Sequence, residues 1–155
     1  MKKFYDTSSL LLEENFDEKI IISSITLFEL EEIKTSSRKD EDTKLAARRL
    51  LHALDSKAID HEVIIYNSHM LRAIESMGVD INNDVKILAT AINYCRSYAD
   101  NKMLFYTNDL ALKTIAAIFF GADCVRSVEV KPDNYCGYIE LTLSEDELAS
   151  LYENL

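Results

Sequence analysis

Short apolar runs alternate along the chain with longer segments whose apolar residues recur three and four positions apart. The short runs predict strands, and the clearest is 20–22, because three consecutive isoleucines suit a strand buried on both faces of a parallel sheet. The longer segments predict amphipathic helices. Strands are expected at 3–5, 20–22, 62–66, 103–106 and 124–126, and helices at 10–14, 27–33, 42–57, 70–77, 84–98 and 110–119. This alternation predicts an α/β fold with a central, mainly parallel sheet between helices.

The last part of the chain differs in character from the rest. The segment 131–138 contains the only proline and one of the three glycines, which is typical of a connector. After it, 139–143 alternates like a strand, and Ser144–Glu147 forms a capping box that predicts a final helix. We therefore expect one domain at 1–130 and a C-terminal appendage, a short strand and a helix, at 131–155.

Charge is distributed unevenly along the chain. The formal net charge of −10 argues against nucleic-acid binding through the whole surface. Six of the seventeen basic residues nevertheless fall within the sixteen positions 34–49, which makes this segment a candidate for local contact with a nucleic acid. A solvated helix surface is the alternative, because acidic residues are interspersed. The six are Lys34, Arg38, Lys39, Lys44, Arg48 and Arg49.

Composition favours the cytoplasm over a membrane or a secreted location. No apolar run approaches the ~20 residues that a membrane span needs, and the charged start at 1–6 is not typical of a signal peptide. The three cysteines are odd in number and lack metal-ligand spacing, which indicates reduced thiols. We therefore expect a cytoplasmic protein with no membrane contact.

Four acidic residues stand where the predicted strands end or the following helices begin. Asp6 follows the first strand and Asp109 follows the fourth, while Asp84 opens a helix and Glu29 lies one turn into the helix after the second strand. In a parallel α/β sheet the carboxyl ends of the strands share one edge, and ligands bind in the crevice there. The pattern predicts carboxylates that converge on a single pocket. The alternative for each is a helix cap, including a capping box at 26–29.

Carboxylates that are gathered in one pocket repel one another, so their negative charge must be offset. Two like charges about 4 Å apart repel by ~4 kcal/mol at an effective dielectric near 20. No lysine or arginine adjoins Asp6 or Asp109 in the sequence, and only Lys86 is close to Asp84. Oxygen ligands without an organised set of His or Cys favour Mg²⁺ or Mn²⁺ over zinc. A cation of this kind suits phosphate chemistry, because it polarises a phosphoryl oxygen and lowers the pKa of a bound water.

These motifs resemble, in order and spacing, those of the PIN domain, a metal-dependent ribonuclease fold. The resemblance covers 2–128 and depends on 6–11, on Glu29 after 24–26, on 83–91 and on 106–109. It implies a PIN-like three-layer fold in which Asp6, Glu29, Asp84 and Asp109 hold the metal. Thr107 would add a hydroxyl to this catalytic group. Ser8 and Lys86 would contact the site or the substrate phosphate, with a helix-capping serine and a solvated lysine as the alternatives.

The form of 83–88 and the tail at 135–140 are similar to the PIN half of PhoH-type proteins, in which PIN is joined to an ATPase. This chain departs from that group, because it contains no Gly-x-x-x-x-Gly-Lys-Ser/Thr phosphate loop. We therefore expect ATP-driven unwinding to require a separate ATPase partner. A second departure is Asn108, which stands where that group commonly has a basic residue.

The leading hypothesis is a metal-dependent endoribonuclease that cleaves single-stranded RNA with metal-activated water. Lys34, Arg38, Arg48 and Arg49 are the candidate contacts to the RNA backbone. One alternative is a catalytically silent PIN-fold module that binds RNA or protein, and another is the toxin of a toxin–antitoxin pair with an inhibitory protein partner. A receiver-type phosphoacceptor is disfavoured, since that fold needs an aspartate after its central strand and Asn67 follows the third strand here. By resemblance, a homodimer is a reasonable expectation.

Overall fold

Parallel strands form the centre of the fold. The computed structural model describes residues 1–100 and 102–130. In this part of the chain β1 (Lys2–Tyr5), β2 (Ile20–Ser23), β3 (His61–Ile64), β4 (Met103–Tyr106) and β5 (Val125–Arg126) pair in the order β3-β2-β1-β4-β5. Every pairing is parallel, so the predicted α/β fold with a parallel sheet is confirmed.

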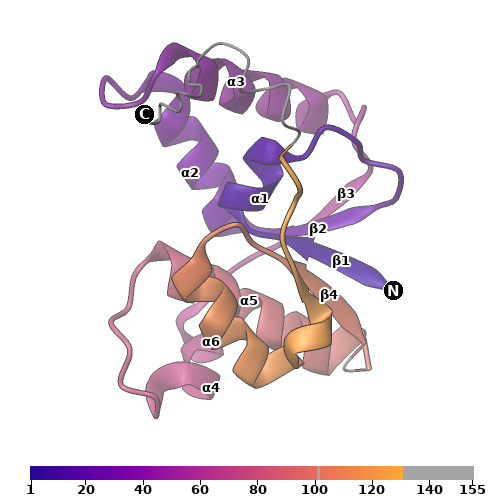
Figure 1. The fold of residues 1–155 in the computed structure, drawn as a ribbon, viewed down its shortest axis with the longest axis vertical. Coiled ribbons are helices and arrows are strands. Elements are labelled where there is room, and N and C mark those ends of the chain that lie inside the picture. The colour runs from indigo at the N-terminus through magenta and orange to yellow at the C-terminus, as the bar shows by residue number, and fades with distance from the viewer. Residues whose placement is uncertain (101, 131–155) are drawn as a thin grey trace, which may run out of the picture.

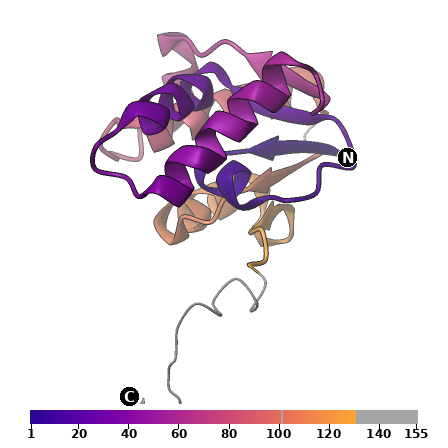
Figure 2. The same cartoon turned by 90° about the horizontal axis from the view of Figure 1, so that it is seen from above.

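Helices cover both faces of this sheet (Figure 1). On one face lie α1 (Thr7–Leu12), α2 (Ser24–Thr35) and α3 (Glu41–Asp55), with α3 running across the strands in Figure 2. On the other face lie α4 (Arg72–Glu75), α5 (Asn83–Tyr98) and α6 (Leu110–Phe120). Two short 3-10 turns, η1 (Ser68–Leu71) and η2 (Ala122–Cys124), complete the described elements.

Alternation along the strands divides the interior into two cores. Phe4 and Ile21 face the α5 side, whereas the neighbouring Tyr5 and Ile20 face the α3 side. Successive strand residues point to opposite faces, which explains why runs that look uniformly apolar fill both cores. The helix α5 contributes nine buried residues to the interior. Even α5, the longest described helix at 16 residues, is too short and polar to cross a membrane, and the same holds for the other described helices.

The direction in which strands are added changes between β1 and β4. The chain lays down β1, β2 and β3 outward on one side, then returns to place β4 on the other side of β1. The connections on the two sides run over opposite faces, as Figure 1 shows. Such a reversal leaves a crevice outside the carboxyl ends of the two central strands, and this crevice is where ligands bind in open α/β sheets. Asp6 follows β1, and Thr107 follows β4.

Two predicted helix starts were wrong, for the same physical reason. The helix expected at 10–14 begins at Thr7, because Asp6 caps it by accepting a hydrogen bond from the Ser9 backbone N–H at 2.9 Å. The helix expected from 27 begins at Ser24, because Ser23 caps it. The alternative interpretation of 26–29 as a capping box is therefore wrong, and α2 does not need Glu29 for its N-terminus.

Other boundaries shifted by smaller amounts. The expected strand 62–66 is His61–Ile64, and the expected helix 70–77 is divided between η1 and α4. Gly78 and Gly121 adopt positive φ angles of 69° and 86° just beyond helical segments, which favours glycine there. The division at 130, the strand expected at 139–143 and the helix expected from Ser144 concern residues outside those described, so these stay predictions.

We predict that Leu88→Ala lowers the free energy of unfolding by about 2–5 kcal/mol, because Leu88 is fully buried beneath the sheet and the deletion leaves a cavity. Urea denaturation followed by circular dichroism measures the change. Ile118→Ala in α6 is the control, since that side chain is 68% exposed and its truncation should cost within about 0.5 kcal/mol. Equal losses in the two variants would contradict the core described here.

Candidate functional site

Asp6 lies at the centre of the site and is 1% exposed. Its Oδ1 accepts hydrogen bonds from the Ser9 backbone N–H at 2.9 Å and from the hydroxyls of Ser9 and Ser8 at 2.8 and 2.9 Å. Its Oδ2 accepts from the Thr107 hydroxyl at 2.5 Å. Burial raises the pKa of Asp6, and these hydrogen bonds oppose that effect. The carboxylate is therefore held in place by hydroxyl and amide donors.

Two hydroxyl groups connect Asp6 to the turn after β4. Thr107, which is fully buried, donates to Asp6 and accepts from the Asp109 backbone N–H at 3.0 Å. Ser8 donates to Asp6 and accepts from the Asn108 backbone N–H at 3.0 Å. The side chain of Asp109 caps α6 by accepting from the Leu112 backbone N–H at 3.0 Å. These contacts fix the position of the turn relative to the end of β1.

Glu29 joins the same edge from α2. Its Oε1 accepts from the hydroxyl of Thr7, the residue directly after Asp6, at 2.5 Å. Its Oε2 accepts from the side-chain amide of Asn83, the residue directly before Asp84, at 3.4 Å. Glu29 therefore lies between the β1–α1 junction and the start of α5.

Asp84 is the second residue of α5 and does not cap it. Asn82 performs that function, with its Oδ1 accepting from the Val85 backbone N–H at 2.9 Å. Burial, the charges of Asp109, Glu29 and Asp6 in that order, and a hydrogen bond with the Asp109 carboxyl raise the pKa of Asp84 to about 6. Asp84 therefore lies within electrostatic reach of each of the other three predicted acids.

The charge of this group is not balanced by cationic side chains. Across residues 1–100 and 102–130, ion pairs join Lys3 to Glu18, Lys34 to Glu31 and Lys44 to Glu41, and none includes the four acids. Within those ranges no three Asp, Glu, His or Cys side chains are close enough to form an assembled metal site. The four acids are neighbours at one edge of the sheet, and their oxygen donors are of the kind that Mg²⁺ and Mn²⁺ prefer.

The structure separates the predicted substrate-binding residues. Arg38 lines a cavity of about 400 Å³ that Glu29 also lines. Lys34, paired with Glu31 at 2.6 Å, and Arg48 line a different cavity of about 760 Å³, to which none of the four acids contributes. Arg49 is exposed on α3. The Ser8 hydroxyl donates a hydrogen bond to Asp6. Ser8 does not cap α1, because Asp6 is the capping residue.

Lys86 lies beside an aromatic ring near the start of α5. Its Nζ is 5.8 Å from the centroid of the Tyr66 ring, a cation–π contact on a half-buried side chain. The Tyr66 backbone N–H donates to the Ser24 hydroxyl at 2.9 Å, which ties this ring to the N-terminus of α2. The ring of Tyr66, in the connection that follows β3, therefore holds the Lys86 side chain near the start of α5, two residues after Asp84.

Three further residues contact the acids, although the sequence predicted no site role for them. Thr7 and Asn83 donate to Glu29, and Ser9 donates to Asp6. The sequence signal for these contacts is proximity to an acid: Thr7 and Asn83 are directly next to one, and Ser9 is three residues after one. Asn108 has a structural role, because its side-chain amide pairs with the Val128 backbone at 2.8 and 3.0 Å.

Comparison with known proteins identifies the family to which the chain belongs. The profile of the PIN domain family matches residues 4–121, more than half of the chain, and this range contains the four acids and Thr107. A search of curated proteins finds no match. Proteins of the matched family are in general nucleases that use divalent metal ions. The family match and the parallel sheet with helices on both faces show that this chain belongs to the PIN domain family.

Proposed function

We propose that this protein is an endoribonuclease that hydrolyses phosphodiester bonds of single-stranded RNA with the help of Mg²⁺ or Mn²⁺. The observation that supports this most is the environment of Asp84, where burial and then the charges of Asp109, Glu29 and Asp6 raise the pKa to about 6. Unbalanced carboxylates at the switch point of a parallel sheet favour a site for a cation. The similarity to the PIN half of PhoH-type proteins stays a prediction from the residues alone.

Each residue of the site has a role in this proposal. Asp6, Glu29, Asp84 and Asp109 would hold the cation, which supplies charge neutralisation at the phosphate and a bound water of lowered pKa. Thr107 and Ser8 would position the Asp6 carboxylate, because each donates its only hydroxyl proton to that group. The catalytic contribution of Thr107 is therefore through Asp6 and through the backbone N–H of Asp109.

The RNA backbone would contact the basic segment of α2 and α3. The overall charge of −10 repels a polyanion, so binding needs a local cationic surface. Arg38 shares a cavity with Glu29, while Lys34, Arg48 and Arg49 would extend the contact along α2 and α3. Lys86, beside Asp84 in sequence, would approach the phosphate from α5.

The alternatives and partners stay predictions as well. A silent module that binds RNA or protein would have no need for three carboxylates around Asp84, whose repulsion of its charge lowers stability. Action as a toxin, a homodimer, and a separate ATPase or inhibitory protein as partner are proposals from the resemblance. Growth arrest on expression that is relieved by Asp6→Asn would support the toxin.

Asp84→Asn should reduce Mn²⁺-dependent cleavage of single-stranded RNA by at least about 100-fold, because it removes a charge from the cation site. The measurement is the initial rate of cleavage of a fluorescent RNA at neutral pH. Asp80→Asn is the matched control, since Asp80 is an exposed residue four positions earlier and takes no part in the described network. An unchanged rate in Asp84→Asn would reject the assignment of the site.

Without divalent metal, the same substitution should stabilise the protein at neutral pH. The pKa of Asp84 is raised in the folded state, so its unfavourable contribution is absent below about pH 4 and complete above about pH 6. The asparagine side chain of the variant keeps a donor for the Asp109 carboxyl but carries no charge. We expect the unfolding temperature in a chelator at pH 7 to rise by about 2–4 °C, or on the order of 1 kcal/mol after allowance for solvent screening. The gain should disappear at pH 4.

Thr107→Val should weaken both stability and activity, because the substitution keeps the shape and removes the hydroxyl between Asp6 and the Asp109 N–H. The buried Asp6 carboxylate and the half-buried Asp109 N–H then each lose a partner, and we expect a loss of about 1–3 kcal/mol in the free energy of unfolding. Thr107→Ser restores the hydroxyl and should recover most of the activity. Equal defects in the valine and serine variants would show that the methyl group matters and that the hydroxyl does not.

A further inference from the structure

The turn between α2 and α3 carries two basic side chains beside the acidic site. Arg38 and Lys39 line the cavity of about 400 Å³ that also contains Glu29, together with Glu32, Ile33 and Ser36. Both basic residues are exposed. In the part of the chain that the structure describes, neither forms an ion pair.

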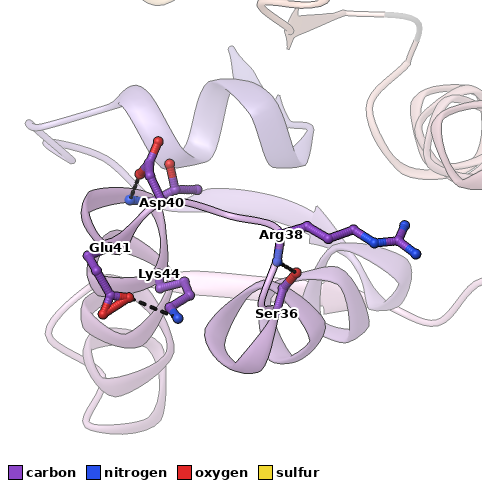
Figure 3. A network of polar contacts seen from close by, with 6 residues as sticks. Ser36, Arg38, Asp40, Glu41 and Lys44 are labelled. Carbon is purple, nitrogen blue, oxygen red and sulfur yellow. Dashed lines mark hydrogen bonds and ion pairs between the residues drawn. The ribbon is translucent and has the colours of Figure 1, made fainter.

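The acidic residues closest to them in sequence are engaged elsewhere (Figure 3). Asp40 caps α3, accepting from the Thr43 backbone N–H at 2.7 Å, and that hydrogen bond holds the pKa of the Asp40 carboxyl below its ordinary value. Glu41 pairs with Lys44 at 2.8 Å. Figure 3 shows the Arg38 side chain extending away from both groups. Its charge is therefore available to a ligand in the cavity.

One face of α2 leads from the acidic site to this turn. Glu29, Glu32 and Ser36 recur at the spacing of three and four residues that places side chains on one helix face. The seven positions from 29 to 36 correspond to a rise of roughly 10 Å along the helix. At the far end, the Ser36 hydroxyl accepts from the Arg38 backbone N–H at 3.1 Å, which holds the turn that presents Arg38.

We propose that Arg38 and Lys39 form a binding subsite for a backbone phosphate of the RNA strand, next to the phosphate that is cleaved. This inference rests on the proposed function and deepens it, because it says where the uncleaved strand lies. The strand would run along the α2 face, with the scissile bond at Glu29 and its neighbour at the turn. Glu32 lies between the two positions and would weaken binding by like-charge repulsion.

The other basic residues of the segment do not compete for this role. Lys34 is paired with Glu31, and with Arg48 it lines a cavity on a different face of α2. Lys44 is paired with Glu41 and lines neither of these cavities. The fold thus divides a continuous basic stretch of sequence, and places only the turn residues with the acidic site.

The test is the steady-state cleavage of an unstructured RNA oligonucleotide with Mn²⁺ by the wild type and the double variant Arg38→Ala/Lys39→Ala. We expect KM to rise about tenfold with little change in kcat, because the lost contacts are to substrate that does not react. The dependence of log(kcat/KM) on log salt concentration should also become shallower by about 0.7 per lost phosphate contact. A dinucleoside monophosphate has no neighbouring phosphate, so both proteins should cleave it equally well.

Two further variants sharpen the test. Glu32→Gln should lower KM, because it removes the repulsion inside the cavity. Lys44→Ala is the matched control from the same segment and should behave as the wild type, since an exposed ion pair contributes little. Thermal unfolding of each variant confirms that it is folded.

Unchanged KM and salt dependence in the double variant would overturn the subsite, and so would a defect of equal size on the dinucleoside monophosphate. A wild type that cleaves no RNA would instead reject the proposed function. In that event the subsite is decided by fluorescence anisotropy of labelled RNA with Mn²⁺. Weaker binding by Arg38→Ala/Lys39→Ala than by Lys44→Ala supports the subsite, and equal binding overturns it.

Discussion

The repulsion between carboxylates at one edge of the parallel sheet is the main physical constraint on this site, because the fold must hold like charges close together. The sheet brings Asp6 and the Asp109 turn together because β1 and β4 are neighbours whose connections run over opposite faces. Burial of Asp6 and the raised pKa of Asp84 show the unfavourable side of this arrangement. Hydroxyl and amide donors hold the group together without neutralising it. The negative charge therefore remains available for a cation.

The four acids differ in how firmly the fold holds them. Asp6 and Asp109 are helix caps, so each is anchored by backbone N–H groups at the start of α1 or α6. Glu29 and Asp84 are relieved of capping by Ser23 and Asn82. Their contacts are to side chains, which leaves them more freedom to adjust their positions. Two anchored and two adjustable carboxylates suit a site in which a cation completes the arrangement.

Surface charge and the acidic site are linked through α2. Near its start Thr26 of this helix accepts a hydrogen bond from Thr7, the residue after Asp6. The helix carries Glu29 in its second turn and ends at a turn with two exposed basic residues. In a chain with a net charge of −10, the face of α2 that carries Glu29 therefore ends at a local cationic turn, where the proposed contact with RNA lies. Asn108, directly before Asp109, is committed to the backbone of Val128.

The sequence by itself determined the succession of strands and helices and the parallel sheet, because these follow from periodicity. It also predicted four acids as candidate metal ligands, from their positions where strands end and helices begin. It misplaced the starts of α1 and α2, since Asp6, Ser23, Thr7 and Thr26 are all residues that cap helices, and local pattern does not choose between them. Only the tertiary structure decided that Thr107 binds Asp6 across 101 positions. It also decided that Arg38 shares a cavity with Glu29 while Lys34 does not. Such contacts depend on the order of the strands in the sheet and on which face of a helix is turned toward the site. Neither of these features is determined by residues that are close together in the sequence.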